Sequence, residues 1–218
     1  MSLCNNSNII KAYSFFYIFS GNNYLKTAPD IIADEVEPYG CSGMFDSCSK
    51  LKSIDKINVK KVGNRGFSSM FNYCSSLVNI PSILPATELG AYCYQQMFKG
   101  CTSLVTAPEL PATTLEFNCY ENMFSDCGSL VQSPELPATT LANECYRGMF
   151  SYCSSLTQAP ELPATTLANS CYNAMFRNCS SLTQAPSILP ATTLAENCYY
   201  YMFFGCTSLV RAPYLPAP

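Results

Sequence analysis

The sequence contains no histidine, and only 12% of its residues are charged. Histidine is the usual general base and a common zinc ligand, so its absence removes the ordinary forms of acid–base and zinc chemistry. The sequence also lacks a Cys-x-x-Cys pair, a phosphate-binding Gly-x-x-x-x-Gly-Lys-Ser/Thr loop, a Gly-x-Ser-x-Gly elbow and a His-Glu-x-x-His helix. We therefore expect no catalytic residues, no bound metal and no cofactor.

The sequence also lacks a strong excess of charge of one sign, and it lacks long apolar runs. The 12 Lys and Arg residues against 15 Asp and Glu residues give a net charge of -3, which is too weak to attract a nucleic acid. No stretch approaches the roughly 20 apolar residues that cross a bilayer, so we expect no membrane insertion. Residues Ala12 to Phe19 are apolar but have only Lys11 before them and no small-residue cleavage site after them. We expect no signal peptide in this sequence.

What the sequence does contain is an internal repeat, marked by a Met-Phe pair. Consecutive pairs are 26, 27, 26, 26, 26 and 27 residues apart, and they occur at Met44, Met70, Met97, Met123, Met149, Met175 and Met202. The two longer intervals carry one extra residue before a Leu-Pro, at Ile83 and Ile188. A length change confined to one place indicates a loop there, while the rest of each repeat stays in register.

The repeats also suggest how the chain is divided. Counting back 26 residues from Met44 reaches Ile18, so a degenerate copy begins in the apolar N-terminal stretch. Terminal repeats are commonly atypical because one of their faces meets solvent. We predict a divergent N-terminal capping repeat over residues 1–43 and a solenoid over 44–218. The last repeat is incomplete, and the whole chain forms one continuous domain.

Within each repeat, apolar residues recur every four positions. One such row is Leu141, Cys145, Met149 and Cys153, and Tyr146 and Phe150 form a second row beside it. Two adjacent rows of this spacing predict the apolar face of a helix, with Thr139 or Thr140 as its N-cap. The prolines around residues 156–163 leave room for a strand of only three or four residues, stacked in parallel on its equivalents. The predicted fold class is an α/β repeat solenoid, a leucine-rich-repeat-like right-handed superhelix of strand-turn-helix units of about 26 residues.

The run Met-Phe-x-x-Cys-x-x-Leu, followed by Ala-Pro-x-Leu-Pro and a Thr-rich turn, resembles the BspA-like, or Treponema-type, leucine-rich repeats. The resemblance extends from about Ile18 to the end of the chain. The sequence differs from the family in the Met before the Phe, in an additional Cys, and in a repeat a few residues longer. The resemblance implies a bacterial surface protein that recognises macromolecules of a host or a neighbouring cell.

The 14 cysteines include two columns that recur from repeat to repeat. The two Cys of a repeat are eight residues apart, which on the predicted helix is about 12 Å. Because a disulfide needs Cα atoms within roughly 7 Å, we expect none within a repeat. Bridges between repeats stay open, but Cys also suits a crowded core, so we expect mainly buried reduced thiols. The Met, Phe and Tyr columns are interpreted as core rather than as a ligand groove.

The positions that vary between repeats predict the binding surface. One set follows the Leu that recurs in each repeat, and the other precedes the Leu-Pro. Both sets are expected to project from the strand face of the solenoid. The predicted binding residues are Thr106, Glu109, Gln132, Glu135, Thr157, Gln158, Glu161, Thr183, Gln184, Arg211 and Tyr214.

Three functions stay open at this point. The first is a non-catalytic interaction module that binds a protein or glycan through the strand face, with a cell-surface location implied by the resemblance. The second is a structural segment of a larger fibre or phage tail, since apolar repeat surface is expected to be uncovered at the C-terminal end and to allow end-to-end self-association. The third is an intracellular inhibitor or decoy in the cytoplasm, which fits the expected lack of a signal peptide and the expected reduced cysteines. An N-glycosylation triplet, Asn5-Asn6-Ser7, would bear on the location only if the protein is exported.

Overall fold

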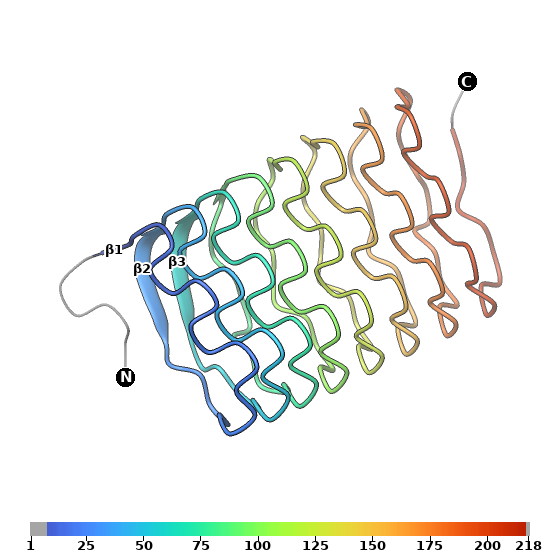
Figure 1. Ribbon diagram of the computed structural model, residues 1–218. Coiled ribbons are helices and arrows are strands. Elements are labelled where there is room, and N and C mark those ends of the chain that lie inside the picture. Colours follow the sequence, from blue (N-terminus) through green and yellow to red (C-terminus); the bar gives the residue numbers. More distant parts are fainter. Residues whose placement is uncertain (1–7, 217–218) are drawn as a thin grey trace.

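The computed structural model describes residues 8–216 and shows coils stacked along one axis (Figure 1). The triplet at residues 5–7 lies outside the described residues. Each coil has two walls. In the coil that begins at Tyr92, residues 92–101 wind back and forth and form what we call the wavy wall, and residues 104–115 return in an extended path that we call the flat wall. The flat wall of every coil lies beside that of the next, which establishes a repeat solenoid.

The predicted helices are wrong, because the part of the chain that the structure describes contains no α-helix. In the wavy wall, alternate amides donate to the following coil, as from Tyr120 to the carbonyl of Cys145 at 3.0 Å and from Asn122 to that of Arg147 at 2.8 Å. The amides between them donate three residues back, as from Glu121 to Asn118. The wavy wall is thus a chain of tight turns in which half of the hydrogen bonds are local and half join coils.

The turns require left-handed backbone at every fourth residue. Positive φ angles occur at residues 118, 122 and 126 of one coil, and the same triplet recurs in each coil along the solenoid. Nineteen of these residues are not glycine. A non-glycine residue with positive φ is uncommon, and Asn and Asp adopt it most readily. Asn118, Asn122 and Asp126 follow that preference. At equivalent positions Tyr39 and Ser69 are held by hydrogen bonds to the next coil, from Tyr39 to Asn64 at 3.0 Å and from Ser69 to Gln95 at 2.8 Å.

The period of four arises because residues point inward in pairs and outward in pairs. Cys119 and Tyr120 are buried, Asn122 lies near the surface, and Met123 and Phe124 are buried again. An α-helix turns by about 100° per residue, so a row spaced by four would rotate by about 40° at each step. Over the 12 residues from Leu141 to Cys153 such a row would leave the core face. A strict period of four fits a wall of turns better than a helix.

Columns of stacked aromatic rings fill the core. The phenylalanine column runs from Phe19 through Phe203, with neighbouring ring centroids 5.5–5.7 Å apart and planes within 10° of parallel. A tyrosine column beside it joins Tyr94, Tyr120, Tyr146, Tyr172 and Tyr199 at 5.7–6.0 Å. Each ring packs on the equivalent ring of the next coil, so the spacing between coils sets the stacking distance. Aromatic pairs in such offset arrangements add stability beyond the area they bury.

Regular strands occur only near the N-terminus of the flat wall. They are β1 (Ile9–Ile10), β2 (Ile31–Val36), β3 (Ile57–Val62) and β4 (Glu88–Leu89), which form one parallel sheet in the order β1-β2-β3-β4. Both long strands are rich in Ile and Val and alternate buried with less buried residues, as expected for a strand with one face on the core. Ile31 pairs with Ile57 and Val36 with Val62, so the buried residues stay in register.

The flat wall of the later coils has single parallel bridges in place of strands. The positions equivalent to β3 read Leu-Pro-Ala-Thr-Thr-Leu, as in residues 110–115, and they pair only at Thr114 with Thr140. Proline has no amide hydrogen to donate, which limits the ladder. The sequence predicts the strand at residues 156–163 and a helix cap at Thr139 or Thr140. The residues equivalent to β3 are instead those of the Leu-Pro-Ala-Thr-Thr text, and residues 156–163 contribute only the two bridges that Gln158 forms, with Gln132 and with Gln184.

The described cysteines have a definite role in the core. Thirteen are free; twelve of them are buried and Cys206 is half-buried. The second cysteine of each coil donates its thiol to the carbonyl of the core phenylalanine in the preceding coil, as from Cys153 to Phe124 at 3.1 Å. The same bond recurs at Cys74, Cys101, Cys127, Cys179 and Cys206. These thiols therefore satisfy buried backbone acceptors as well as filling space.

Candidate interaction surface

The eleven predicted binding residues all lie on the flat wall, and all of them are exposed. They alternate with buried residues of the same segment, such as Leu136 and Leu162, which face the core. Parallel bridges join Thr106 to Gln132, Gln132 to Gln158 and Gln158 to Gln184. The structure therefore brings the predicted residues of successive coils into adjacent positions along one wall.

Every one of the eleven residues also lines a shallow groove between neighbouring coils. One groove, of about 600 Å³, lies between residues 131–137 and residues 157–163. A second, of about 640 Å³, includes Thr106 and Glu109. A third, of about 800 Å³, includes Thr183, Gln184, Arg211 and Tyr214. The grooves share Gln132, Glu135, Gln158 and Glu161 at their borders, so they form a continuous series.

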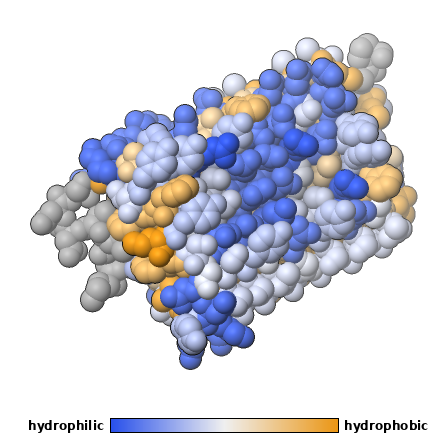
Figure 2. Space-filling view, in the orientation of Figure 1, coloured by the Kyte–Doolittle hydropathy of each residue, from blue (hydrophilic) through white to orange (hydrophobic). Residues whose placement is uncertain are grey.

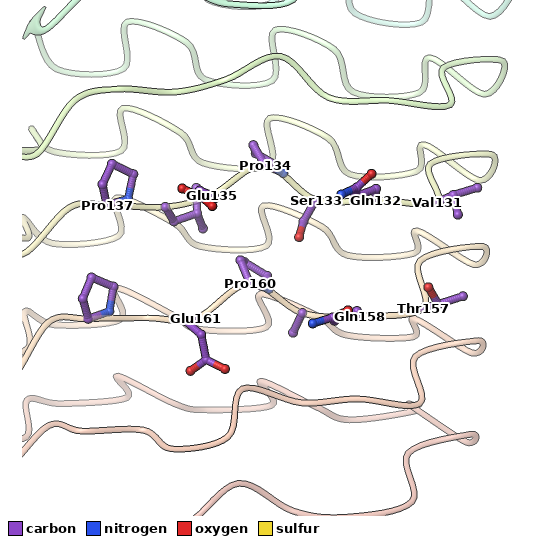
Figure 3. Close-up of a pocket in the computed structure, with 13 residues that line it drawn as sticks. Val131, Gln132, Ser133, Pro134, Glu135, Pro137, Thr157, Gln158, Pro160 and Glu161 are labelled. Atoms are coloured by element: carbon purple, nitrogen blue, oxygen red, sulfur yellow. The ribbon is translucent and has the colours of Figure 1, made fainter.

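Prolines and carboxylates give these grooves their chemical character. Figure 3 shows Pro134 and Pro137 of one coil above Pro160 of the next, with Glu135 and Glu161 on the same wall. Proline lacks an amide donor and presents a rigid apolar ring, so the floor of the groove is apolar and preformed. The carboxylates and the Gln amides provide the polar groups at its edges.

The acidic column of this wall is incompletely paired. Glu161 accepts hydrogen bonds from the Ser187 amide at 3.1 Å and from the Ser187 hydroxyl at 3.3 Å. Glu109 and Glu135 form no ion pair with another described residue. Their carboxylates are thus available to a cation or a hydrogen-bond donor from a ligand.

Two further features were not found from the sequence. Arg177 lies within 6.0 Å of the ring centroids of Tyr152, Tyr201 and Phe204 on the wavy wall. Glu121 is buried, and its carboxylate accepts from Gln95 at 2.7 Å and from Asn118 at 2.6 Å. Both clusters join outward-pointing residues of different coils on the wavy wall. The helix interpretation places these residues on helices and therefore does not predict the contacts between them.

The buried cysteines are held in their thiol form. Burial raises the pKa of Cys171 and of Cys179 to about 12. The thiolate is the nucleophilic form, so these groups are unreactive at neutral pH. The described residues contain no group of three Cys, Asp or Glu side chains placed to hold a metal ion. Nor do they contain a helix with the length and apolar character needed to cross a bilayer.

No family model matches the sequence, and no curated protein matches it. Two solved structures resemble the fold. A leucine-rich repeat protein from Bacteroides ovatus is 20% identical over 93% of this chain and 69% of its own, with a TM-score of 0.38. A leucine rich cell surface protein from Faecalibacterium prausnitzii is 15% identical over 91% of this chain and 74% of its own, with a TM-score of 0.28. Neither likeness is close enough to support an argument about function, and the solenoid rests on the pairing between its own coils.

Proposed function

We propose that this protein is a non-catalytic interaction module that binds an extended segment of another macromolecule along its flat wall. The observation that carries the proposal is the continuous series of grooves that all eleven exposed residues line. Extended binding surfaces of this kind are what solenoids offer. A ligand lying across several coils would repeat the same contacts in each groove.

The chemistry of the grooves favours a polypeptide over a glycan. Glu109 and Glu135 are unpaired acids, and the proline rings beside them are apolar. A segment with Lys or Arg side chains between apolar ones would satisfy both features. A neutral glycan would satisfy the Gln amides but leave the carboxylates without a charge partner. The sequence resemblance to BspA-like repeats supports a bacterial cell-surface setting for this interaction.

The proposal can be tested with peptide and glycan arrays and a charge-reversed variant. Glu109→Lys combined with Glu135→Lys should abolish binding to the basic peptides that the unmodified protein binds. The two new Lys side chains would then face the Lys or Arg side chains of the peptide. A matched control is Glu116→Lys combined with Glu196→Lys, which makes the same change of net charge at exposed residues outside these three grooves.

Equal loss of binding in the two double variants would show that net charge, and not the flat wall, determines the interaction. Binding restricted to glycans would replace the polypeptide ligand by a carbohydrate. No signal above background on either array would overturn the proposal.

A further inference from the structure

The C-terminal end of the wavy wall carries a row of backbone donors that have no acceptor among the described residues. In the preceding coil, the amides of residues 170, 172, 174, 176 and 178 donate to carbonyls of the last coil, at 2.7–3.0 Å. The equivalent amides of the last coil donate to no other described residue; they belong to Asn197, Tyr199, Tyr201, Phe203 and Gly205. Their spacing and direction are set by the same turns as in every other coil.

The N-terminal end carries the complementary row of backbone acceptors. In the second coil, the carbonyls of Pro38, Gly40, Ser42, Met44 and Asp46 accept from the first coil. The equivalent carbonyls of the first coil accept from no other described residue; they belong to Ala12, Ser14, Phe16, Ile18 and Ser20. One end of the wavy wall therefore offers donors, and the other end offers acceptors at the same intervals.

Columns that are buried within the solenoid become exposed at its two ends. Ile18 occupies the position of Met44, yet it is 54% exposed whereas Met44 is 0% exposed. At the other end Leu194, the equivalent of Leu167, is 50% exposed against 7%. Eleven of the nineteen exposed large hydrophobic residues belong to the two end coils, and Leu194 immediately precedes the last coil. On the face shown in Figure 2, hydrophobic surface gathers near both ends, with hydrophilic surface between them.

We propose that copies of this chain stack head to tail, with the C-terminal coil of one copy on the N-terminal coil of the next. In this arrangement the amides of Asn197, Tyr201 and Gly205 meet the carbonyls of Ala12, Phe16 and Ser20 of the second copy. Phe203 continues the phenylalanine column onto Phe19. Each of these contacts reproduces one that already joins neighbouring coils within the described residues.

This inference goes beyond the proposed function, because it uses the ends of the solenoid and leaves the flat wall uncovered. A head-to-tail contact between different surfaces does not close on itself, so it produces a linear filament. In such a filament the grooves of successive copies would follow one another along one wall. A ligand that binds weakly to one copy would then bind more strongly to the assembly.

The test blocks one end at a time in the full 218-residue chain and measures mass by sedimentation. Ile18→Asp blocks the acceptor end and Leu194→Asp blocks the donor end, because stacking would bury an unpaired carboxylate. Both residues are exposed in a single copy, so folding should be unchanged, and circular dichroism checks this. Tyr152→Asp is the matched control, since Tyr152 is 45% exposed on the wavy wall in the middle of the solenoid and lines none of the three grooves.

We expect the mass of the unmodified protein and of Tyr152→Asp to rise with concentration. Each end variant alone should stay monomeric to at least about tenfold higher concentration. An equimolar mixture of the two should form dimers and nothing larger, because only one free donor end and one free acceptor end can meet. A monomeric unmodified protein at all concentrations would overturn the proposal, and so would dimers of either end variant alone. None of the substituted residues lines the three grooves, so a peptide short enough to contact a single copy should bind all of these variants equally well.

Discussion

The N-terminal coils and the later coils build the same solenoid with different flat walls. In β2 and β3, buried Ile and Val residues are separated by less buried ones, and five residue pairs form a ladder. In the coils that read Leu-Pro-Ala-Thr-Thr-Leu, one bridge replaces the ladder at the same place. The wavy wall and the phenylalanine column hardly change between the two regions. The comparison indicates that the wavy wall and the core hold the solenoid, and that the flat wall can vary.

The largest effect is expected from the core that both regions share. Phe124→Ala should lower the free energy of unfolding by about 3–5 kcal/mol, because Phe124 is fully buried between Phe98 and Phe150. Phe45→Ala, beside the long strands, should cost about the same. Denaturant unfolding measures both, with the exposed Phe204→Ala as control. A much smaller cost at Phe45 than at Phe124 would show that the strands, and not the core, stabilise the N-terminal coils.

The buried thiols of the later coils should make the free energy of unfolding depend on pH. Burial raises the pKa of Cys171 and of Cys179 from 9.0 to about 12, so above pH 9 the unfolded chain loses protons that the folded chain keeps. Stability is then fully present below pH 9 and falls as the pH rises toward 12, by up to about 1.4 kcal/mol per pH unit for each such thiol. Urea unfolding at pH 7 and pH 10, with a reductant present, tests this. Unchanged stability at pH 10 would contradict the burial of these thiols.

Exchanging the flat-wall residues tests the comparison directly. Asn58→Pro places in β3 the proline that occurs at the equivalent position 85, and it should shorten the ladder and cost about 1–2 kcal/mol. The reverse exchange, Pro137→Asn, should change stability by less than about 1 kcal/mol, because no ladder exists there to be improved. Hydrogen exchange of the amides in β2 and β3 reports on the loss. An Asn58→Pro cost as large as that of Phe124→Ala would make the ladder, and not the core, the main support.

The smallest effect is expected from the ion pairs that cross the ladder. Lys60 pairs with Asp34 at 2.9 Å, and this hydrogen bond raises the pKa of Lys60 and lowers the pKa of Asp34. Both side chains are well exposed, so Lys60→Gln should move the urea midpoint only slightly at low ionic strength and not at all at high salt. The contribution of Asp34 is present above its unfolded pKa and is lost as the pH falls below it. A large shift of the urea midpoint that does not depend on salt would mean that the Lys60–Asp34 pair contributes substantially to stability.

The repeat, its length and its core residues could be predicted from the sequence, and the wavy wall could not. Identical residues at fixed intervals show which positions stack, so the solenoid and the buried Met-Phe pairs follow from spacing alone. The four-residue rows fit both a helix and a series of turns over a short stretch. The signals that favour turns were the strict period of four and the Gly, Asn and Asp residues at positions such as Asn118, Asn122 and Gly148.

The sequence predicted which residues lie on the exposed wall, but it did not predict the grooves between the coils. Variation between repeats indicated which residues face solvent, and all eleven lie on one wall. The grooves between coils depend on where consecutive proline rings and Glu side chains lie relative to each other, which one repeat considered alone does not reveal. The complementary backbone groups at the two ends were also hidden, because the sequence shows side chains and not unpaired amides.

The most direct test of the central claim is the far-ultraviolet circular dichroism spectrum, combined with backbone chemical shifts measured by NMR. A wall of turns predicts a spectrum without the paired negative bands of an α-helix. It also predicts non-helical shifts through residues 118–127, with left-handed values at Asn118, Asn122 and Asp126. A helical spectrum, with continuous helical shifts from residue 141 to residue 153, would contradict the account and restore the strand-turn-helix repeat.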